Sequence, residues 1–425
     1  MNILVVGGGG REHAIIKKLK ENPSVATIYA LPGNGGIAAD AECVDIGPKE
    51  IDRIVAFAKS HVIGFAVVAP DDPLALGCVD RLHEAGIPCF GPNASAARIE
   101  SSKVFSKNLM RKYNIPTAAY AVFDDSGAAL EYLKTASYPT VIKADGLALG
   151  KGVMIPQSFA EAETAVKSIM EDRIFGASGS EIVVEEFLTG PEVSVLAFTD
   201  GTSIAPMVSS MDHKRIGDGD TGPNTGGMGT IAPNPCYTPQ IADVCMETIF
   251  QPTLAAMRAE GCPFKGCLYF GLMLTPDGPK VIEYNCRFGD PETQVVLPLL
   301  KTDLLTIMQS VETETLGELQ LSWSDGAAAC VILASGGYPT AYEKGKPITV
   351  PAELPANVTV YHAGDKLDNG TLVTSGGRVL GVTATASSLQ EALEDAYAAA
   401  ETIHFDKAYM RHDIGRRALA AMEER

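Results

Sequence analysis

Basic residues are scarce in this sequence: 34 lysines and arginines stand against 52 aspartates and glutamates, for a net charge of −18. No basic run is present, and nucleic-acid binding depends on clustered positive charge, so no nucleic-acid partner is expected. An acidic chain that handles anions must gather its few lysines and arginines locally. The surroundings of these residues therefore indicate where an anionic ligand could bind.

Paired cysteines and long apolar runs are also missing. The nine cysteines are odd in number and scattered, without a C-x-x-C motif or a paired Cys/His spacing. We therefore expect neither disulfides nor a zinc site, and a location in the reducing cytoplasm. No apolar run approaches the roughly 20 residues that a membrane-spanning helix needs. No charged segment followed by an apolar one opens the chain, so we expect neither a membrane partner nor a signal peptide.

The length and the order of the segments predict a mixed α/β and α+β multidomain protein of roughly three domains. Residues 1–102 alternate strand-like and helix-like segments, which predicts a doubly wound parallel sheet. Residues 103–325 predict a two-lobed domain whose smaller lobe covers about 122–190, and residues 326–425 predict a β-rich C-terminal domain. The glycine-rich segment GDGDTGPNTGGMG lacks periodicity and predicts a long loop, which in a compact domain is usually functional.

The chain opens with a short apolar strand and four glycines, MNILVVGGGGREHA. A dinucleotide-binding fingerprint needs a third glycine, and an acidic residue about 20 positions later. Glu12 or His13 stands at the third position and the next strand ends in LPGNGG, so binding of NAD is not favoured. Backbone N–H groups at the start of a helix still suit one phosphate, with Arg11 as a charged contact. A tight turn without a ligand is an equally supported interpretation.

Residues 146–152, GLALGKG, lack the spacing of a Walker A loop, the Ser or Thr after its lysine, and the helix that should follow. The segment instead predicts a β-hairpin with a glycine tip, bracketed by Lys143 and Lys151. A glycine hairpin laid over phosphates, with lysines that neutralise them, is another way to hold ATP. The alternative is a plain hairpin with two solvated lysines, but Lys143 ends an apolar run and would sit within a sheet.

The segment EIVVEEFLTGPE predicts a strand that ends beside a purine. A strand edge offers a backbone donor and a backbone acceptor, which is the pair that adenine needs, and Glu192 could accept from ribose hydroxyls. Two surface acids at a strand end are the alternative, which is favoured when this segment is taken alone.

The segment KVIEYNCRFGDPETQ predicts a metal site. Glu283 and Asn285 lie two apart on a predicted strand and therefore face the same side. Hard oxygen ligands from one strand suit a Mg²⁺ ion that bridges phosphates.

In this order along the chain, Lys103, Lys143, GLALGKG, EEFL, Glu192 and EYN resemble the ATP-grasp superfamily. More narrowly, GGREHA, PGN-x-G, MDHKRIGDGDTGPNTGGMG and EYNCRFGDPETQ resemble the glycinamide ribonucleotide synthetase family, and the likeness runs nearly from end to end. The resemblance implies an N-terminal pre-ATP-grasp domain, a two-lobed ATP-grasp domain and a C-terminal domain. Two of these motifs exceed ten residues, so the match is more specific than any short pattern.

The resemblance also implies an activity, namely ATP-dependent ligation of glycine to 5-phosphoribosylamine through glycyl phosphate. The products would be glycinamide ribonucleotide, ADP and phosphate, with Mg²⁺ or Mn²⁺ bound beside ATP. The nucleophiles are the substrates themselves, so no Ser/His/Asp triad is required, and the partners are small molecules only. We expect a monomer.

Site residues are implied in four groups, and His213 is expected to be a structural hydrogen-bonding histidine. The group for ATP is Lys103, Lys143, Gly150, Lys151, Gly152, Glu185, Glu186, Phe187, Leu188 and Glu192. The group for 5-phosphoribosylamine is Gly8, Gly9, Gly10, Arg11, Gly33, Asn34 and Asp71. The metal group is Glu283 and Asn285. The group near glycine and the reacting phosphates is Asp212, Lys214, Arg287 and Asp290.

Two departures from the family's pattern fall on the phosphoribosylamine side. Gly8 stands where the family usually has Asn, and Ala69-Pro70-Asp71 replaces the usual Gly-Pro-Glu. Three alternatives stay open: another ATP-grasp ligase or carboxylase of purine biosynthesis, an NAD-dependent oxidoreductase, and a nucleotide sensor without catalysis. Dependence of ATP hydrolysis on glycine, and its indifference to bicarbonate, would separate the first alternative from the family's own reaction.

Overall fold

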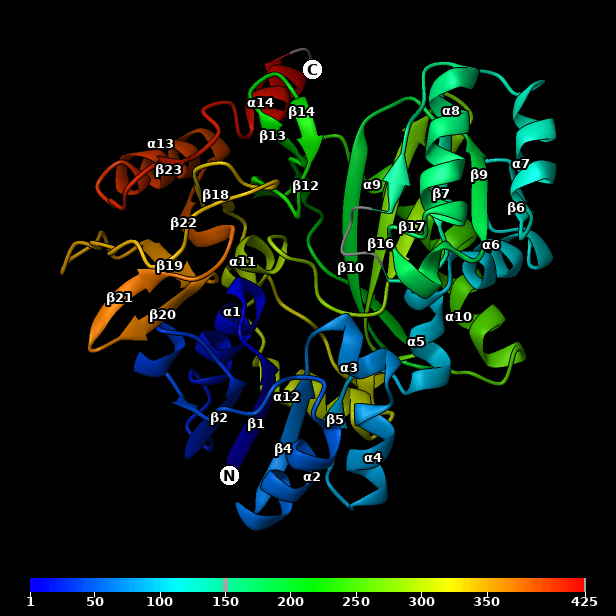
Figure 1. Ribbon diagram of the computed structural model, residues 1–425. Helices are drawn as coiled ribbons and strands as arrows, with labels where there is room; N and C mark the ends of the chain where they lie inside the picture. Colours follow the sequence, from blue (N-terminus) through cyan, green and yellow to red (C-terminus); the bar gives the residue numbers. More distant parts are fainter. Residues whose placement is uncertain (148–151, 424–425) are drawn as a thin grey trace.

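The computed structural model describes residues 1–147 and 152–423. Figure 1 shows the N-terminal sheet (blue) at the bottom, the lobe of β6 to β9 at the upper right and the C-terminal sheet (orange and red) at the upper left. The strands β10, β16 and β17 lie between the N-terminal sheet and the lobe. Within the described ranges, no helix combines the length and the apolar character needed to cross a membrane.

The N-terminal sheet is parallel, with strand order β3-β2-β1-β4-β5. Its strands are apolar on both faces, because alternate residues of β1 pack in opposite directions. Leu4 and Val6 contact the core under α2 and α4, whereas Ile3 and Val5 contact the core under α1. The predicted doubly wound sheet is confirmed. Its elements are β1 (Asn2–Gly7), α1 (Gly10–Leu19), β2 (Thr27–Pro32), β3 (Glu42–Cys43), α2 (Ile51–Ser60), β4 (Ile63–Val68), α3 (Asp71–Ala75), α4 (Cys78–Glu84), β5 (Cys89–Phe90) and α5 (Ala94–Ser101).

The smaller lobe has an antiparallel sheet, with order β6-β9-β7-β8, and a core of its own formed with α7 and α8. Lys143 on β7 pairs with Val153 on β8, as the predicted glycine hairpin requires. The tip of this hairpin, with Gly150 and Lys151, lies outside the described residues. The elements are α6 (Lys103–Lys112), β6 (Tyr120–Phe123), α7 (Ser126–Leu133), β7 (Thr140–Ala144), β8 (Val153–Met154), α8 (Phe159–Val166) and β9 (Ile182–Glu186).

The central sheet is antiparallel, with order β11-β10-β16-β17. Its aromatic core includes Phe250 and Phe270, whose ring centroids lie 4.3 Å apart. Helix α12 packs in the same apolar cluster as both this sheet and the N-terminal sheet, so it joins the two. The elements are β10 (Glu192–Asp200), β11 (Ile204–Pro206), α9 (Pro239–Cys245), α10 (Gln251–Ala259), β16 (Lys265–Thr275), β17 (Gly278–Asn285), α11 (Thr293–Val296) and α12 (Leu304–Glu312).

The C-terminal sheet has the order β12-β15-β18-β22-β19, and β23 also pairs with β18. Helix α13 covers one of its faces. Two of its strands, β12 and β15, come from inside the range predicted for the ATP-grasp domain. The elements are β12 (Met211–Asp212), β15 (Gly229–Ala232), β18 (Ala327–Ser335), β19 (Val358–His362), β20 (Asp365–Asp368), β21 (Thr371–Thr374), β22 (Arg378–Ala386), α13 (Leu389–Ala400), β23 (Ala408–Tyr409) and α14 (Arg416–Glu423).

The glycine-rich segment is not the long loop that its composition predicts. Strands β13 (Arg215–Gly217) and β14 (Thr221–Asn224) pair as a hairpin. Arg411, from the C-terminal segment, donates to the carbonyl oxygen of Arg215 and to Asp220 Oδ1, at 3.1 and 3.0 Å. Gly219 N–H donates to Asp413 Oδ2 at 2.8 Å. These contacts come from residues far along the chain, so local periodicity could not have revealed them.

Candidate active site

Glu283 on β17 is the centre of a group of cationic side chains. The Lys214 ammonium, with Nζ at 3.4 Å from Glu283 Oε1, does most to lower the pKa of Glu283 to about 2, against the opposing effect of burial. Lys143, Lys103 and Arg287 lower that pKa further. Glu283 is therefore ionised at neutral pH, within a field that is positive overall. This is the local concentration of cations that an acidic protein needs in order to hold an anion.

These cations come from separate elements. Lys103 is the first residue of α6, and its Nζ donates to the carbonyl oxygen of Gly146 at 2.8 Å. Lys143 lies on β7, Lys214 follows β12 and Arg287 follows β17. Burial lowers the pKa of Lys103, whereas Glu283 raises that of Lys214 well above its usual range. The smaller lobe, the central sheet and the entry to the glycine-rich hairpin thus meet at one place.

Glu185 has a different role from the one its sequence context suggests. Its carboxylate pairs with two lysines: Oε1 lies 2.9 Å from Lys143 Nζ and Oε2 lies 2.8 Å from Lys107 Nζ. Its carbonyl oxygen accepts from Thr140 Oγ1 at 2.8 Å. Sequence reasoning missed Lys107, although it follows Lys103 by one turn of α6 and so shares its face.

The chain becomes available to a purine only beyond Glu186. The Glu186 N–H donates to the carbonyl oxygen of Ala119 at 2.9 Å, and its Oε1 accepts from Ala119 N–H at 3.0 Å. Phe187, which is exposed, and Leu188 follow the end of β9. Glu192 begins β10, and its Oε2 lies 3.7 Å from Lys214 Nζ, so it stands beside the cationic group.

Glu283 and Asn285 are compatible with a hard divalent cation. The side-chain amide of Asn285 satisfies its surroundings when its nitrogen donates to Glu100 Oε1 at 3.0 Å and to the Tyr284 carbonyl oxygen at 3.2 Å. Its oxygen then points away from these acceptors and can serve as a ligand. Together with the ionised Glu283 it offers two hard oxygen donors, which suit Mg²⁺ or Mn²⁺. The described residues form no cluster of three His, Cys, Asp or Glu side chains that could hold a metal, so the remaining ligands would come from phosphates or water.

Asp290 is held from the C-terminal sheet. Arg378, the first residue of β22, places Nη2 at 3.1 Å from Asp290 Oδ2. Its Nη1 donates to the carbonyl oxygens of Asp290 and Gly226, both at 2.8 Å. Burial would raise the pKa of Asp290, but Arg378 and Arg11 lower it to below its usual value. Sequence reasoning missed Arg378 as a site residue, although it lies in the stretch GGRVLGVTA, which also resembles the family.

Asp212 lies close to this group. A Cβ atom added at Gly227 would lie 2.5 Å from Asp212 Oδ1, so the glycine-rich segment needs glycine there. Gly227 also has a positive φ of 115°, which favours glycine. Burial, with the nearby Glu292, raises the pKa of Asp212 well above its usual range.

The opening glycines lie beside Asp290. Gly9 N–H donates to Glu12 Oε2 at 2.6 Å, which caps the start of α1, and a Cβ at Gly9 would lie 3.6 Å from Asp290 Oδ2. Arg11 donates to Glu12 Oε1 at 2.7 Å and to the Phe288 carbonyl oxygen at 3.2 Å. The structure therefore brings the residues predicted for 5-phosphoribosylamine next to those predicted for the reacting phosphates.

The neighbouring loop is already engaged by backbone groups. Asn34 Nδ2 donates to the carbonyl oxygens of Gly8 and His362, at 3.0 and 2.8 Å. Its Oδ1 accepts from the N–H groups of Gly36 and Ile37. A Cβ at Gly8 would lie 2.3 Å from the Gly33 carbonyl oxygen, so the asparagine that the family usually has at this position would need the two loops to separate. A contact between the Asn34 side chain and a substrate stays a prediction.

Asp71 begins α3 and faces Arg287. Burial would lower the pKa of Arg287, but Glu100, with Oε1 at 3.0 Å from Arg287 Nη2, and Asp71 raise it overall. Arg287 Nε is buried without a hydrogen-bond partner in the described part of the chain. Glu100 thus pairs directly with this guanidinium, and the charge of Asp71 acts on it as well.

His213 is a structural histidine, as expected. Its Nε2 accepts from Gly415 N–H at 3.1 Å, so Nδ1 carries the proton and donates to the Gly229 carbonyl oxygen at 3.1 Å. Burial, with Arg411 and Arg417, lowers its pKa to about 4. The neutral ring joins β15 to the C-terminal segment.

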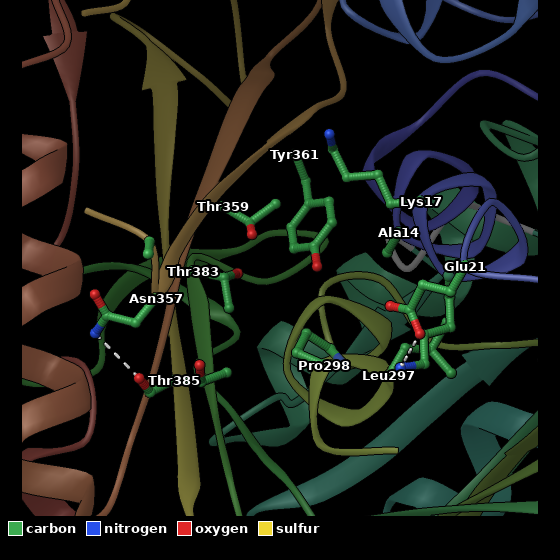
Figure 2. Close-up of a pocket in the computed structure, with 12 residues that line it drawn as sticks. Ala14, Lys17, Glu21, Leu297, Pro298, Asn357, Thr359, Tyr361, Thr383 and Thr385 are labelled. Atoms are coloured by element: carbon green, nitrogen blue, oxygen red, sulfur yellow. Dashed lines mark hydrogen bonds and ion pairs between the residues drawn. The ribbon is translucent and has the colours of Figure 1, made fainter. Parts of the chain in front are cut away.

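A separate cavity lies between α1, residues 297–298 and the strands β19 and β22 (Figure 2). It has a volume of about 200 Å³ and polar walls, with Thr359 and Tyr361 on β19 and Thr383 on β22. None of the predicted site residues that the structure describes lines it. The chemistry at Glu283 therefore belongs to a different place.

Three family models match consecutive parts of the chain. The model described as phosphoribosylglycinamide synthetase, N domain, matches residues 1–100. The ATP-grasp (A) domain of the same family matches residues 101–293, and its C domain matches residues 328–417.

Curated proteins and solved structures agree with these models. Phosphoribosylamine–glycine ligase of Caldanaerobacter subterraneus is 49% identical, covering 97% of this chain and 99% of the relative. A bifunctional purine biosynthetic protein of Pichia angusta is 48% identical, and there the chain matches 54% of the relative's length, about half. The crystal structure of phosphoribosylamine–glycine ligase from Thermotoga maritima is 36% identical, covers 97% of this chain and 100% of that one, and has a TM-score of 0.87.

A biotin carboxylase domain from Hydrogenobacter thermophilus, solved with MgADP and bicarbonate, has a TM-score of 0.73 over 96% of this chain and 91% of that one. At 17% identity it shows the fold alone. The three family models and the relatives at nearly half identity agree, and the chain belongs to the phosphoribosylglycinamide synthetase family.

Proposed function

We propose that this chain ligates glycine to 5-phosphoribosylamine with ATP, giving glycinamide ribonucleotide, ADP and phosphate. The observation that carries the proposal is the ionised Glu283 surrounded by Lys214, Lys143, Lys103 and Arg287. A polyphosphate and a divalent cation complement this mixture of one carboxylate and several cations. The full-length relatives named as phosphoribosylamine–glycine ligases support the choice of substrates.

ATP would lie between the smaller lobe and the central sheet. Lys103, Lys143 and Gly152 would contact its phosphates, and we propose Gly150 and Lys151, outside the described residues, for the same phosphates. Phe187 and Leu188, beyond the end of β9, would line the adenine, and Glu192 would accept from the ribose. Glu185 and Glu186, which the sequence also assigned to ATP, are engaged within the protein by Lys107, Lys143 and Ala119. Glu283 and Asn285 would hold Mg²⁺ or Mn²⁺, which when bound neutralises phosphate charge and orients the γ-phosphate.

In the first step, a carboxylate oxygen of glycine attacks the γ-phosphorus and the bond from that phosphorus to the ADP oxygen breaks. Lys214 and Arg287 would neutralise the charge that develops on the phosphoryl oxygens. Because Glu100 holds Arg287 before the substrate binds, with Oε1 at 3.0 Å from Arg287 Nη2, little reorganisation of this guanidinium is needed during the reaction.

In the second step, the amine of 5-phosphoribosylamine attacks the carbonyl carbon of glycyl phosphate. The bond from that carbon to the phosphate oxygen breaks, phosphate leaves and the amine loses a proton. Gly8 to Arg11, with Gly33, Asn34 and Asp71, would bind the amine substrate. Of these, Gly9 and Arg11 lie beside Asp290 on the proposed phosphate side, and Asp212 lies close by. Exclusion of water between them would protect the acyl phosphate from hydrolysis.

We also propose the domain limits 1–102, 103–325 and 326–425, with the lobe at about 122–190, and a monomer that acts on small molecules. Release of ADP tests the activity. It should require MgATP, glycine and 5-phosphoribosylamine together, and bicarbonate should not replace glycine. Release that depends on bicarbonate would favour a carboxylating ATP-grasp enzyme, and tight binding of NAD without binding of MgATP would overturn the proposal.

A further inference from the structure

Lys107 is a buried cation that the proposed reaction does not use. It lies on α6 with 2% of its side chain exposed. Its Nζ contacts Glu185 Oε2 at 2.8 Å and donates to Thr117 Oγ1 at 2.8 Å, and Thr117 in turn donates to the Val281 carbonyl oxygen at 2.7 Å. A charge this deeply buried is costly unless it is well paired, so its retention needs a reason.

The reason lies on the other side of Glu185. The second oxygen of that carboxylate pairs with Lys143 at 2.9 Å. Lys143 also donates to the carbonyl oxygen of Ile282 at 2.9 Å, one residue before Glu283. A single carboxylate therefore stands between a lysine that faces the cationic group and one that does not.

The net charge of this cluster decides what Lys143 presents to a nucleotide. A lone pair of Glu185 and Lys143 would be neutral, and a neutral pair attracts a polyphosphate weakly. With Lys107 added, the three groups carry one positive charge. Burial lowers the pKa of Lys107 to about 8, although Glu185 raises it. Most Lys107 side chains are therefore protonated at neutral pH.

We infer that Lys107 is a positioning residue for ATP: it holds Glu185 and offsets its charge, so that Lys143 faces the phosphates as a fixed and effective cation. The inference rests on the proposed placement of ATP phosphates at Lys143. Lys107 itself would touch no phosphate, because Glu185, Thr117 and the ring of Tyr120 surround its ammonium.

This role is tested by titrating three variants of the full chain with MgADP and measuring the affinity of each. Lys107→Met removes the charge and keeps the length, and should weaken binding by about tenfold or more. It should also raise KM for ATP while KM for glycine stays within about twofold. Lys107→Arg keeps the charge and should restore most of the affinity. Lys112→Met removes an exposed lysine from the same helix, and should bind MgADP as the unchanged chain does.

The double variant Lys107→Met/Glu185→Gln separates charge from structure. Glutamine carries no charge, so Lys143 keeps its full positive charge in this variant, which should bind MgADP more tightly than Lys107→Met and within about threefold of the unchanged chain. The double variant also tests the role of Lys107 if Lys107→Met alone does not fold, because it removes the charges of Lys107 and Glu185 together. Affinity of Lys107→Met within about twofold of normal, or a double variant weakened more than about tenfold, would overturn the inference.

The same experiment keeps the two proposals apart. If the unchanged chain binds MgADP and releases no ADP in the presence of glycine and 5-phosphoribosylamine, the proposed ligase reaction fails while the role of Lys107 is still measured. If MgADP does not bind the unchanged chain, both proposals fall.

Discussion

The charged group at Glu283 and the charged group at Arg411 are built from the same kinds of side chain and do different things. Glu283 and Lys214 are each about one-third exposed, at 34% and 35%, and their charged atoms are 3.4 Å apart. Arg411 is 1% exposed and pairs with Asp413 at 2.7 Å and with Asp220 at 3.0 Å. The first group is accessible and loosely paired, whereas the second is closed and fully paired.

The difference teaches how to separate a binding site from an anchor in an acidic protein. A carboxylate among several cations has an unbalanced field, which a phosphate or a metal ion can complete. An arginine between two carboxylates, which also donates to a backbone carbonyl, needs no further partner. We expect changes at the first group to affect turnover and changes at the second to affect stability.

The largest expected effect is at Glu283. Glu283→Ala removes a proposed metal ligand and little packing, so kcat/KM should fall by about a thousandfold or more while the thermal unfolding temperature changes little. Steady-state ADP release and a melting curve measure the two quantities. Glu163→Ala, at an exposed helical position, is the control and should keep full activity. Activity that survives in Glu283→Ala would refute the metal assignment.

A change at Arg411 should affect stability and not turnover. Arg411→Met leaves Asp413 and Asp220 without their buried partner and should lower the free energy of unfolding by about 3 kcal/mol. Urea denaturation measures this loss. Arg417→Met is the matched control, because Arg417 also pairs with Asp220, at 3.0 Å, but from the surface, and it should cost at most about 1 kcal/mol. Equal losses in the two variants would show that burial does not distinguish them.

Arg378 lies between the two cases, because its side chain is only 19% exposed and yet contacts a proposed site residue. Arg378→Lys should raise KM for 5-phosphoribosylamine by about tenfold, since an ammonium cannot reproduce contacts with Asp290 and the Gly226 carbonyl oxygen at once. Initial rates at varied substrate concentration measure the change. If KM is unchanged in this variant, Arg378 has a structural role only, as Arg411 does.

The smallest effect concerns pH. The pKa of His213 is lowered to about 4 from an ordinary 6.5, so its neutral ring stabilises the fold fully above pH 6.5, and this contribution is lost as pH falls towards 4. At pH 5.5 the loss should be about 1 kcal/mol. Urea denaturation at pH 7.5 and 5.5 measures it, and His213→Gln should remove most of this dependence. A variant with the same pH dependence as the unchanged chain would assign the effect to another group.

Features encoded within a few neighbouring residues could be predicted from the sequence. The N-terminal parallel sheet follows from apolar strands that alternate with amphipathic helices, and Lys143 was singled out because a lysine at the end of an apolar run is unusual. Glu283 and Asn285 were placed on one face of a strand by their spacing, and the structure has them on β17.

Features that depend on distant partners could not be predicted in this way. Arg411 supports the pairing of β13 and β14 by donating to the carbonyl oxygen of Arg215. The Asn34 side chain donates to the carbonyl oxygen of His362, which lies 328 residues further along the chain. Lys107 was missed because its spacing of one helical turn from Lys103 does not by itself indicate a role: that role depends on Glu185, on strand β9. Only the tertiary structure brings such pairs together.

The C-terminal sheet has a consequence for synthesis of the chain. Its strands β12 and β15 are synthesised before residues 233–326, and their partner β18 begins only at Ala327. Until then β15 has a backbone edge without its neighbour, which is a surface on which nascent chains associate. The last segment to be synthesised thus also completes the sheet that contains β12 and β15, and a chain halted before β18 would leave the region beside Asp212 unfinished.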